Sequence, residues 1–76
     1  MALADIQQYL NLVPAVRESP RRSVWLSYDV DADVLYISFE KPSRATDSEL
    51  TDDDVILRYD GGELVGLTVL RASQRL

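Results

Sequence analysis

The sequence predicts an α+β fold, in which an N-terminal amphipathic helix is followed by a four-stranded antiparallel meander sheet. Three observations lead to this prediction. Apolar residues recur at helical spacing up to residue 13, and strict alternation begins at residue 23. An Asp-Gly-Gly turn then joins the last two alternating runs. The chain divides into a helix and linker, residues 1–22, and a sheet, residues 23–76, within one compact domain.

The helix is predicted from apolar residues that repeat every three or four positions, namely Leu3, Ile6, Leu10 and Val13. Polar residues stand between them, so one side of the helix forms an apolar stripe. Pro14 is expected to end the helix, because proline disfavours the α conformation in the residue before it. The following segment, through Ser23, is typical of a linker with room for one helical turn.

Four runs rich in β-branched and aromatic residues are expected to form the strands, over residues 24–28, 34–39, 55–59 and 64–70. The polar segment between residues 40 and 54, which contains Pro42, is expected to be a loop. Gly61 and Gly62 supply the positive φ angles of a tight hairpin turn. Gly66 interrupts the last run, which predicts a bulge or the close approach of another backbone.

A single narrow helix stripe covers too little of a four-stranded sheet, so the second face is expected to stay open. Alternation places on it the side chains of Trp25, Tyr36, Ile56, Leu64 and Leu70. An apolar area of this size is typical of an interface. We therefore expect a homo-oligomer, with a dimer favoured, in which these residues meet the partner.

Composition excludes several kinds of chemistry. The 76 residues include no cysteine and no histidine, so disulfides, thiolate metal sites and imidazole catalysis are absent. The net charge of −5 argues against nucleic-acid binding, which requires a basic surface. The acidity lies in residues 26–76 and favours either solubility or a basic protein partner. With no membrane span and no signal peptide in the sequence, a cytoplasmic location is expected.

The stretch YDVDADVLYISFE, residues 28–40, has the acid spacing of an EF-hand calcium loop, since Asp29, Asp31, Asp33 and Glu40 occupy four of its ligand positions. Val34 stands where that loop requires glycine. The following strand would also carry Glu40 about 20 Å away, at about 3.3 Å per residue. A hairpin turn is therefore the favoured interpretation, with Asp29 at its start and a two-carboxylate cation site as the alternative.

The acidic run 52–54 allows a similar choice between a cation site and a solvated run that keeps the next strand soluble. No nucleophile motif such as Gly-x-Ser-x-Gly occurs, and no glycine-rich loop precedes a helix. The sequence therefore predicts no catalytic residue, no cofactor and no enzymatic activity.

The segments YDVDADVLYISF, DDVILRYD and GELVGLTVLRAS, taken in order, resemble a small bacterial family, domain of unknown function 2283. The resemblance spans residues 28–73 and leaves the N-terminal helix as an extension. It implies the fold and the domain limits but no catalytic residue. An association of such proteins with small toxin-like proteins suggests an antitoxin-like or accessory role.

Two hypotheses about function follow. The first is a non-enzymatic protein-interaction module that self-associates through the open sheet face. The second is a small ligand- or cation-binding protein that uses the acidic turns at residues 29–33 and 52–54.

Overall fold

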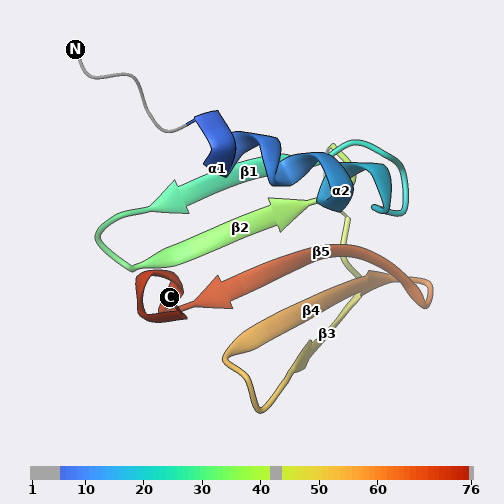
Figure 1. The fold of residues 1–76 in the computed structure, drawn as a ribbon. Helices are drawn as coiled ribbons and strands as arrows, with labels where there is room; N and C mark the ends of the chain where they lie inside the picture. Colours follow the sequence, from blue (N-terminus) through green and yellow to red (C-terminus); the bar gives the residue numbers. More distant parts are fainter. Residues whose placement is uncertain (1–5, 42–43, 76) are drawn as a thin grey trace.

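The computed structural model describes residues 6–41 and 44–75, and it is an α+β fold in which two N-terminal helices lie on one side of an antiparallel sheet (Figure 1). Its helical elements are α1 (Ile6–Leu10), α2 (Leu12–Arg17) and a C-terminal 3₁₀ helix, η1 (Ala72–Arg75). Its strands are β1 (Trp25–Asp29), β2 (Val34–Ser38), β3 (Asp47–Leu50), β4 (Val55–Asp60) and β5 (Glu63–Leu70). No helix in these two ranges is both long enough and apolar enough to cross a membrane.

The N-terminal helix is confirmed, but the prediction that Pro14 ends it is wrong. The helix breaks at Asn11 and restarts, so that Pro14 lies inside α2. Proline is tolerated there because the first N–H groups of a helix have no acceptor within the helix. The missing N–H of Pro14 therefore costs no helical hydrogen bond. Leu3, the first residue of the predicted stripe, lies outside the described residues.

In the described residues, the sheet has five strands in the order β1-β2-β5-β4-β3, so the predictions of four strands and of a meander are both wrong. The unpredicted strand β3 lies within the polar segment that was expected to be a loop. It forms one edge of the sheet, and all four of its residues are exposed. A strand that packs against nothing on either face lacks the apolar alternation by which a strand is recognised.

The extra strand also explains why the order is not that of a meander. Because β3 reverses the chain once more, β4 runs parallel to β2 and β5 runs antiparallel to it. The chain then pairs β5 with β2 in the antiparallel arrangement that all neighbours in this sheet adopt. The longest strand thus lies at the centre of the sheet.

Both glycine predictions are confirmed. Gly61 and Gly62 form the turn between β4 and β5, with φ angles of +59° and +87°. Beside Gly66, the register of β4 and β5 shifts between Arg58 and Tyr59, which is a bulge or similar irregularity. A Cβ atom added to Gly66 would lie 2.9 Å from the carbonyl oxygen of Ile37, so the backbone also approaches closely.

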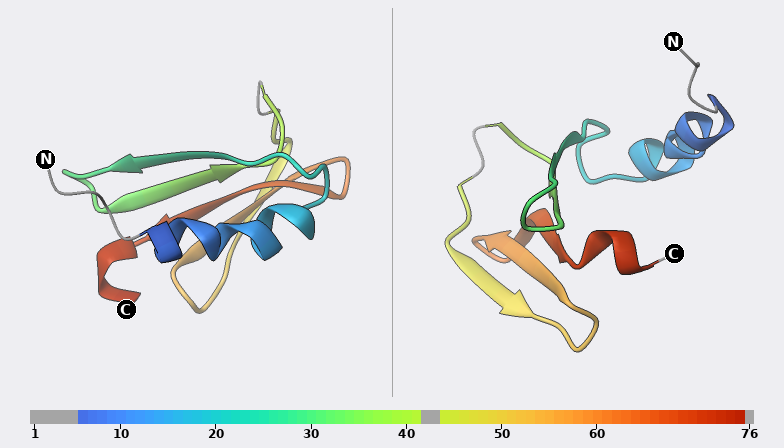
Figure 2. Two further views of the ribbon diagram at one scale, coloured as in Figure 1. Left: turned by 45° about the horizontal axis from the view of Figure 1, so that its top comes forward. Right: turned by 90° about the vertical axis from the view of Figure 1, so that its left-hand side faces the viewer.

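Helices α1 and α2 lie on one side of the sheet, and α2 lies over it. The right-hand view in Figure 2 places α1, α2 and η1 on the same side of the strands. Side chains of α2 and of the sheet enclose an apolar cavity of about 300 Å³, lined by Leu12, Ala15, Val16, Val24, Leu26, Ile37, Phe39 and Leu67. Among the described hydrophobic residues, only Val34 and Val65 are buried, so the helix covers this face without closing it.

Candidate interaction surface

The face of the sheet opposite α2 carries the predicted interface residues. Leu26, Ile37 and Leu67 are cross-strand partners that point toward the helix. The residues between them in each strand therefore point to the other side. We call this other side the open face and define it by six side chains: Trp25, Tyr36, Leu50, Ile56, Leu64 and Leu70.

The strand register places these residues together. One row across all five strands consists of Ser27, Tyr36, Thr68, Ile56 and Leu50. Trp25 lies in the next row along the strands, and Leu70 lies on the other side of the Tyr36 row. Leu64 lies at the bulge, where it pairs with Tyr59.

Several of these side chains are open to solvent. Leu50 is 66% exposed, and Trp25 and Tyr36 are each 42% exposed. Ile56, Leu64 and Leu70 are half-buried by their neighbours in the sheet. A hollow of about 470 Å³ lies at the β1–β2 end, with Trp25 and Tyr36 in its lining. The open face thus carries exposed apolar side chains among polar ones such as Ser27 and Thr68, and it has no covering element in the described part of the chain.

One charged side chain lies within this apolar area. Arg58 is the cross-strand partner of Gly66 and of Ser48, in the same row as Trp25. Its Nη2 atom is 2.5 Å, and its Cζ atom 3.2 Å, from the position that a Cβ on Gly66 would occupy. The guanidinium therefore lies over the β5 backbone at Gly66. The Nε atom is buried and has no hydrogen-bond partner.

The acidic turn at residues 29–33 is occupied by internal hydrogen bonds. The Ala32 N–H donates to Asp29 Oδ1 at 3.1 Å, which confirms Asp29 as the start of the turn. Asp33 Oδ1 accepts from the Tyr28 hydroxyl at 2.6 Å and from the Ser73 N–H at 3.0 Å. Asp33 Oδ2 accepts from the Ser73 hydroxyl at 2.8 Å. Asp33 thereby attaches η1 to the β1–β2 turn.

These contacts shift the ionisation of both partners. The Tyr28 hydroxyl and the two donors of Ser73 favour the carboxylate, so the pKa of Asp33 lies below its ordinary value. The hydrogen bond to Asp33 favours the neutral phenol, so the pKa of Tyr28 lies above its ordinary value. Asp31, the third candidate ligand, is exposed at the apex of the turn.

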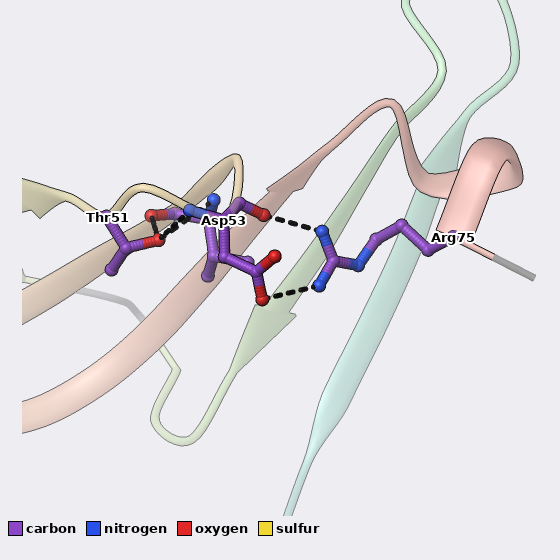
Figure 3. A network of polar contacts seen from close by, with 4 residues as sticks. Thr51, Asp53 and Arg75 are labelled. Atoms are coloured by element: carbon purple, nitrogen blue, oxygen red, sulfur yellow. Dashed lines mark hydrogen bonds and ion pairs between the residues drawn. The ribbon is translucent and has the colours of Figure 1, made fainter.

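The second acidic turn also binds η1. The Thr51 hydroxyl donates to the Val55 carbonyl at 2.9 Å and accepts from the Asp53 N–H at 3.2 Å, which shapes the β3–β4 turn (Figure 3). Asp53 then forms an ion pair with Arg75 at 2.9 Å. Arg75 also donates to the Asp53 carbonyl oxygen. Asp54 forms a longer ion pair, at 3.6 Å, with Arg71.

The two acidic turns therefore act, in this structure, as anchors for the C-terminal segment. The carboxylates of Asp33, Asp53 and Asp54 face Tyr28, Ser73 and two arginines. Within residues 6–41 and 44–75, no group of three acidic side chains is close enough together to hold a metal ion.

The comparisons with known proteins place this fold in a family. The model of a family described as "Protein of unknown function (DUF2283)" matches residues 25–73. The chain belongs to this family. The match begins with the first residue of β1 and ends within η1, and it leaves α1 and α2 outside. No curated protein and no solved structure matched the chain.

The DUF2283 match therefore coincides with the sheet and its C-terminal anchor. Both hydrogen-bonded partners of Asp33, Tyr28 and Ser73, fall within it. So do the whole open face and Arg58.

Sequence reasoning missed two residues of the open face. Leu50 was missed because β3 was not predicted. Arg58 has the same position in the strand alternation as Ile56, and this signal could have placed it on the open face. No local pattern indicated that its guanidinium would lie over Gly66, because that contact depends on the pairing of β4 with β5.

Proposed function

We propose that this DUF2283 protein is a non-enzymatic protein-interaction module that forms a homodimer through its open face. One observation carries the proposal: Trp25 and Tyr36 at one edge and Leu50 at the other are exposed on one sheet face, with Ile56 and Leu70 half-buried between them and no cover in the described chain. A single isolated apolar side chain on a surface needs no explanation, but a continuous apolar area does.

The area of the face suits a dimer of moderate affinity. Five strands about 4.8 Å apart and about six residues long, at about 3.3 Å per residue, give a footprint on the order of 500 Å². Because side chains project from the sheet, the solvent-accessible area of the face is larger than this flat footprint. Specific interfaces at the small end of the range bury about 600 Å² on each partner. We therefore expect dissociation in the micromolar range.

The chain contains its own reporter for this association. Trp25 is the only tryptophan, and it lies on the open face. Burial in a dimer would shift its fluorescence emission to shorter wavelength. We expect this shift to disappear on dilution, at the same concentration at which sedimentation equilibrium shows dissociation to the monomer.

A charged substitution on the face tests where the contact lies. Tyr36→Lys is expected to weaken the dimer by at least tenfold, because a lysine ammonium loses its hydration in an apolar interface. Val30→Lys is the matched control, since Val30 is 74% exposed in the β1–β2 turn and lies outside the open face. A wild-type chain that remains monomeric at several hundred micromolar contradicts the proposal. Equal effects of the two substitutions contradict the choice of this face.

A further inference from the structure

Arg58 is the feature of the open face that an apolar contact alone does not explain. Four of the chain's arginines, Arg17, Arg21, Arg71 and Arg75, form ion pairs with carboxylates. Arg58 has no ion pair within 4 Å among the described residues, although the chain carries 13 acidic residues. A buried polar atom without a partner is uncommon in a native protein, so the state of its Nε atom requires an explanation.

The Arg58 guanidinium lies on the open face, where a molecule bound to that face would contact it. Because Gly66 has no side chain, Arg58 lies across β5 toward the middle of the sheet. An occupant of the open face would exclude water from the terminal nitrogens of Arg58. A desolvated guanidinium is tolerated only when acceptors replace that water. The occupant must therefore bring an acceptor to this point, and a carboxylate is the one that arginine binds best.

A second copy of the chain carries suitable carboxylates on the same face. Asp29 at the end of β1 has the strand parity of the open face, and Asp60 ends β4 two residues beyond Arg58, past the register shift, so both lie at the rim of the sheet. Neither forms an ion pair within the described part of its own chain. In a twofold-symmetric dimer, the open face of one copy packs against the open face of the other. Each Arg58 would therefore contact residues on the open face of the other copy.

We infer that, in the proposed homodimer, Arg58 of each copy binds a rim carboxylate of the other copy, Asp29 or Asp60. The two symmetric ion pairs set the orientation of the copies, while the apolar side chains supply the contact area. This inference rests on the proposed function, and it goes further by identifying a charged recognition site within the interface.

The first test reverses the charge. Arg58→Glu is expected to raise the dissociation constant of the dimer at least tenfold in sedimentation equilibrium. Arg22→Glu is the control, because it makes the same change in net charge at an exposed residue outside the sheet. The control is expected to change the constant by less than about twofold. Arg58→Met, which keeps an apolar chain over Gly66, provides the same test if Arg58→Glu does not fold.

The second test mixes variants. In a homodimer of Arg58→Glu, two carboxylates face each other at each ion-pair position, and a homodimer of Asp29→Arg or Asp60→Arg places two guanidinium groups together. A mixture of Arg58→Glu with the correct aspartate variant restores both ion pairs. It is expected to form a heterodimer with nearly wild-type affinity, which native mass spectrometry distinguishes from the homodimers.

The results separate the two proposals. A heterodimer with either aspartate variant supports the inference. Three results overturn the inference but leave the proposed dimer intact. They are equal effects of Arg58→Glu and Arg22→Glu, an Arg58→Met dimer as tight as the wild-type dimer, and no heterodimer with either aspartate variant. A monomeric wild-type chain overturns both proposals.

Discussion

Replacement of Gly66 by alanine tests the packing at the centre of the sheet. The added Cβ would lie 2.5 Å from Arg58 Nη2 and 2.9 Å from the carbonyl oxygen of Ile37. The arginine end is flexible and can move away. The Ile37 carbonyl belongs to the backbone of β2, which pairs with β5 along five residues, so it moves only if the two strands separate.

The expected cost follows from two opposing effects. Overpacking a well-fitted site costs about 1–3 kcal/mol. Alanine restricts the unfolded chain more than glycine does, which returns about 0.4–1 kcal/mol. We therefore expect Gly66→Ala to lower the free energy of unfolding by about 1–2 kcal/mol. For a domain of this size, that corresponds to a fall in Tm of roughly 5–15 °C.

The measurement is urea or thermal unfolding at one fixed protein concentration, because association would also change the apparent stability. Gly61→Asn serves as the control, since no atom lies within 4 Å of its added Cβ and asparagine tolerates the positive φ of 59°. The cost of Gly66→Ala should fall in an Arg58→Ala background but not vanish, because the Ile37 contact remains. A Gly66→Ala chain as stable as the wild type refutes the described approach of β2 to β5.

Three further predictions concern other parts of the fold. Asp33→Asn should destabilise the chain at pH 7. Because the pKa of Asp33 is lowered in the folded state, its contribution is present above about pH 4 and is lost as the pH falls through the folded value, so urea unfolding of the two chains should converge once the pH lies below that value. Ala15→Leu should raise Tm by a few degrees, because each methylene buried in the apolar cavity under α2 contributes up to about 0.8 kcal/mol. As the control, Val13→Leu should leave Tm unchanged, because Val13 is 57% exposed. If Ala15→Leu gave no gain in Tm, the cavity would be closed in solution. Arg75→Ala should cost less than about 1 kcal/mol in thermal unfolding, because its partner Asp53 is 79% exposed and exposed ion pairs contribute little; a larger loss would show that η1 supports the whole sheet.

Local patterns in the sequence were enough to predict most of the elements. Alternation located β1, β2, β4 and β5, and the two glycines located the β4–β5 turn. Alternation also separates the two faces of each strand, so Trp25, Tyr36 and Ile56 could be assigned to one face before their neighbours were known. These features depend on residues close together in the chain.

The order of the strands depended on a segment with no such pattern. The edge strand β3 carries the residues Asp-Ser-Glu-Leu, and its hydrogen bonds to β4 form whatever its side chains are. Because β3 was not predicted, β4 was predicted to run in the opposite direction. The predicted sheet therefore paired β2 with β4, whereas in the structure β2 pairs with β5. Backbone pairing leaves little trace in side-chain patterns, so the sequence alone could not show that residues 47–50 form a strand.

The sequence by itself determined the elements, the tight turn and the apolar character of the open face, because each follows from the repeat of side chains along one segment. Only the tertiary structure decided that β5 lies between β2 and β4, that Asp33 holds Ser73 forty residues later, and that Arg58 lies unpaired over Gly66. Each of these contacts joins segments distant in the chain. Their existence depends on the strand pairing, which no local pattern encodes.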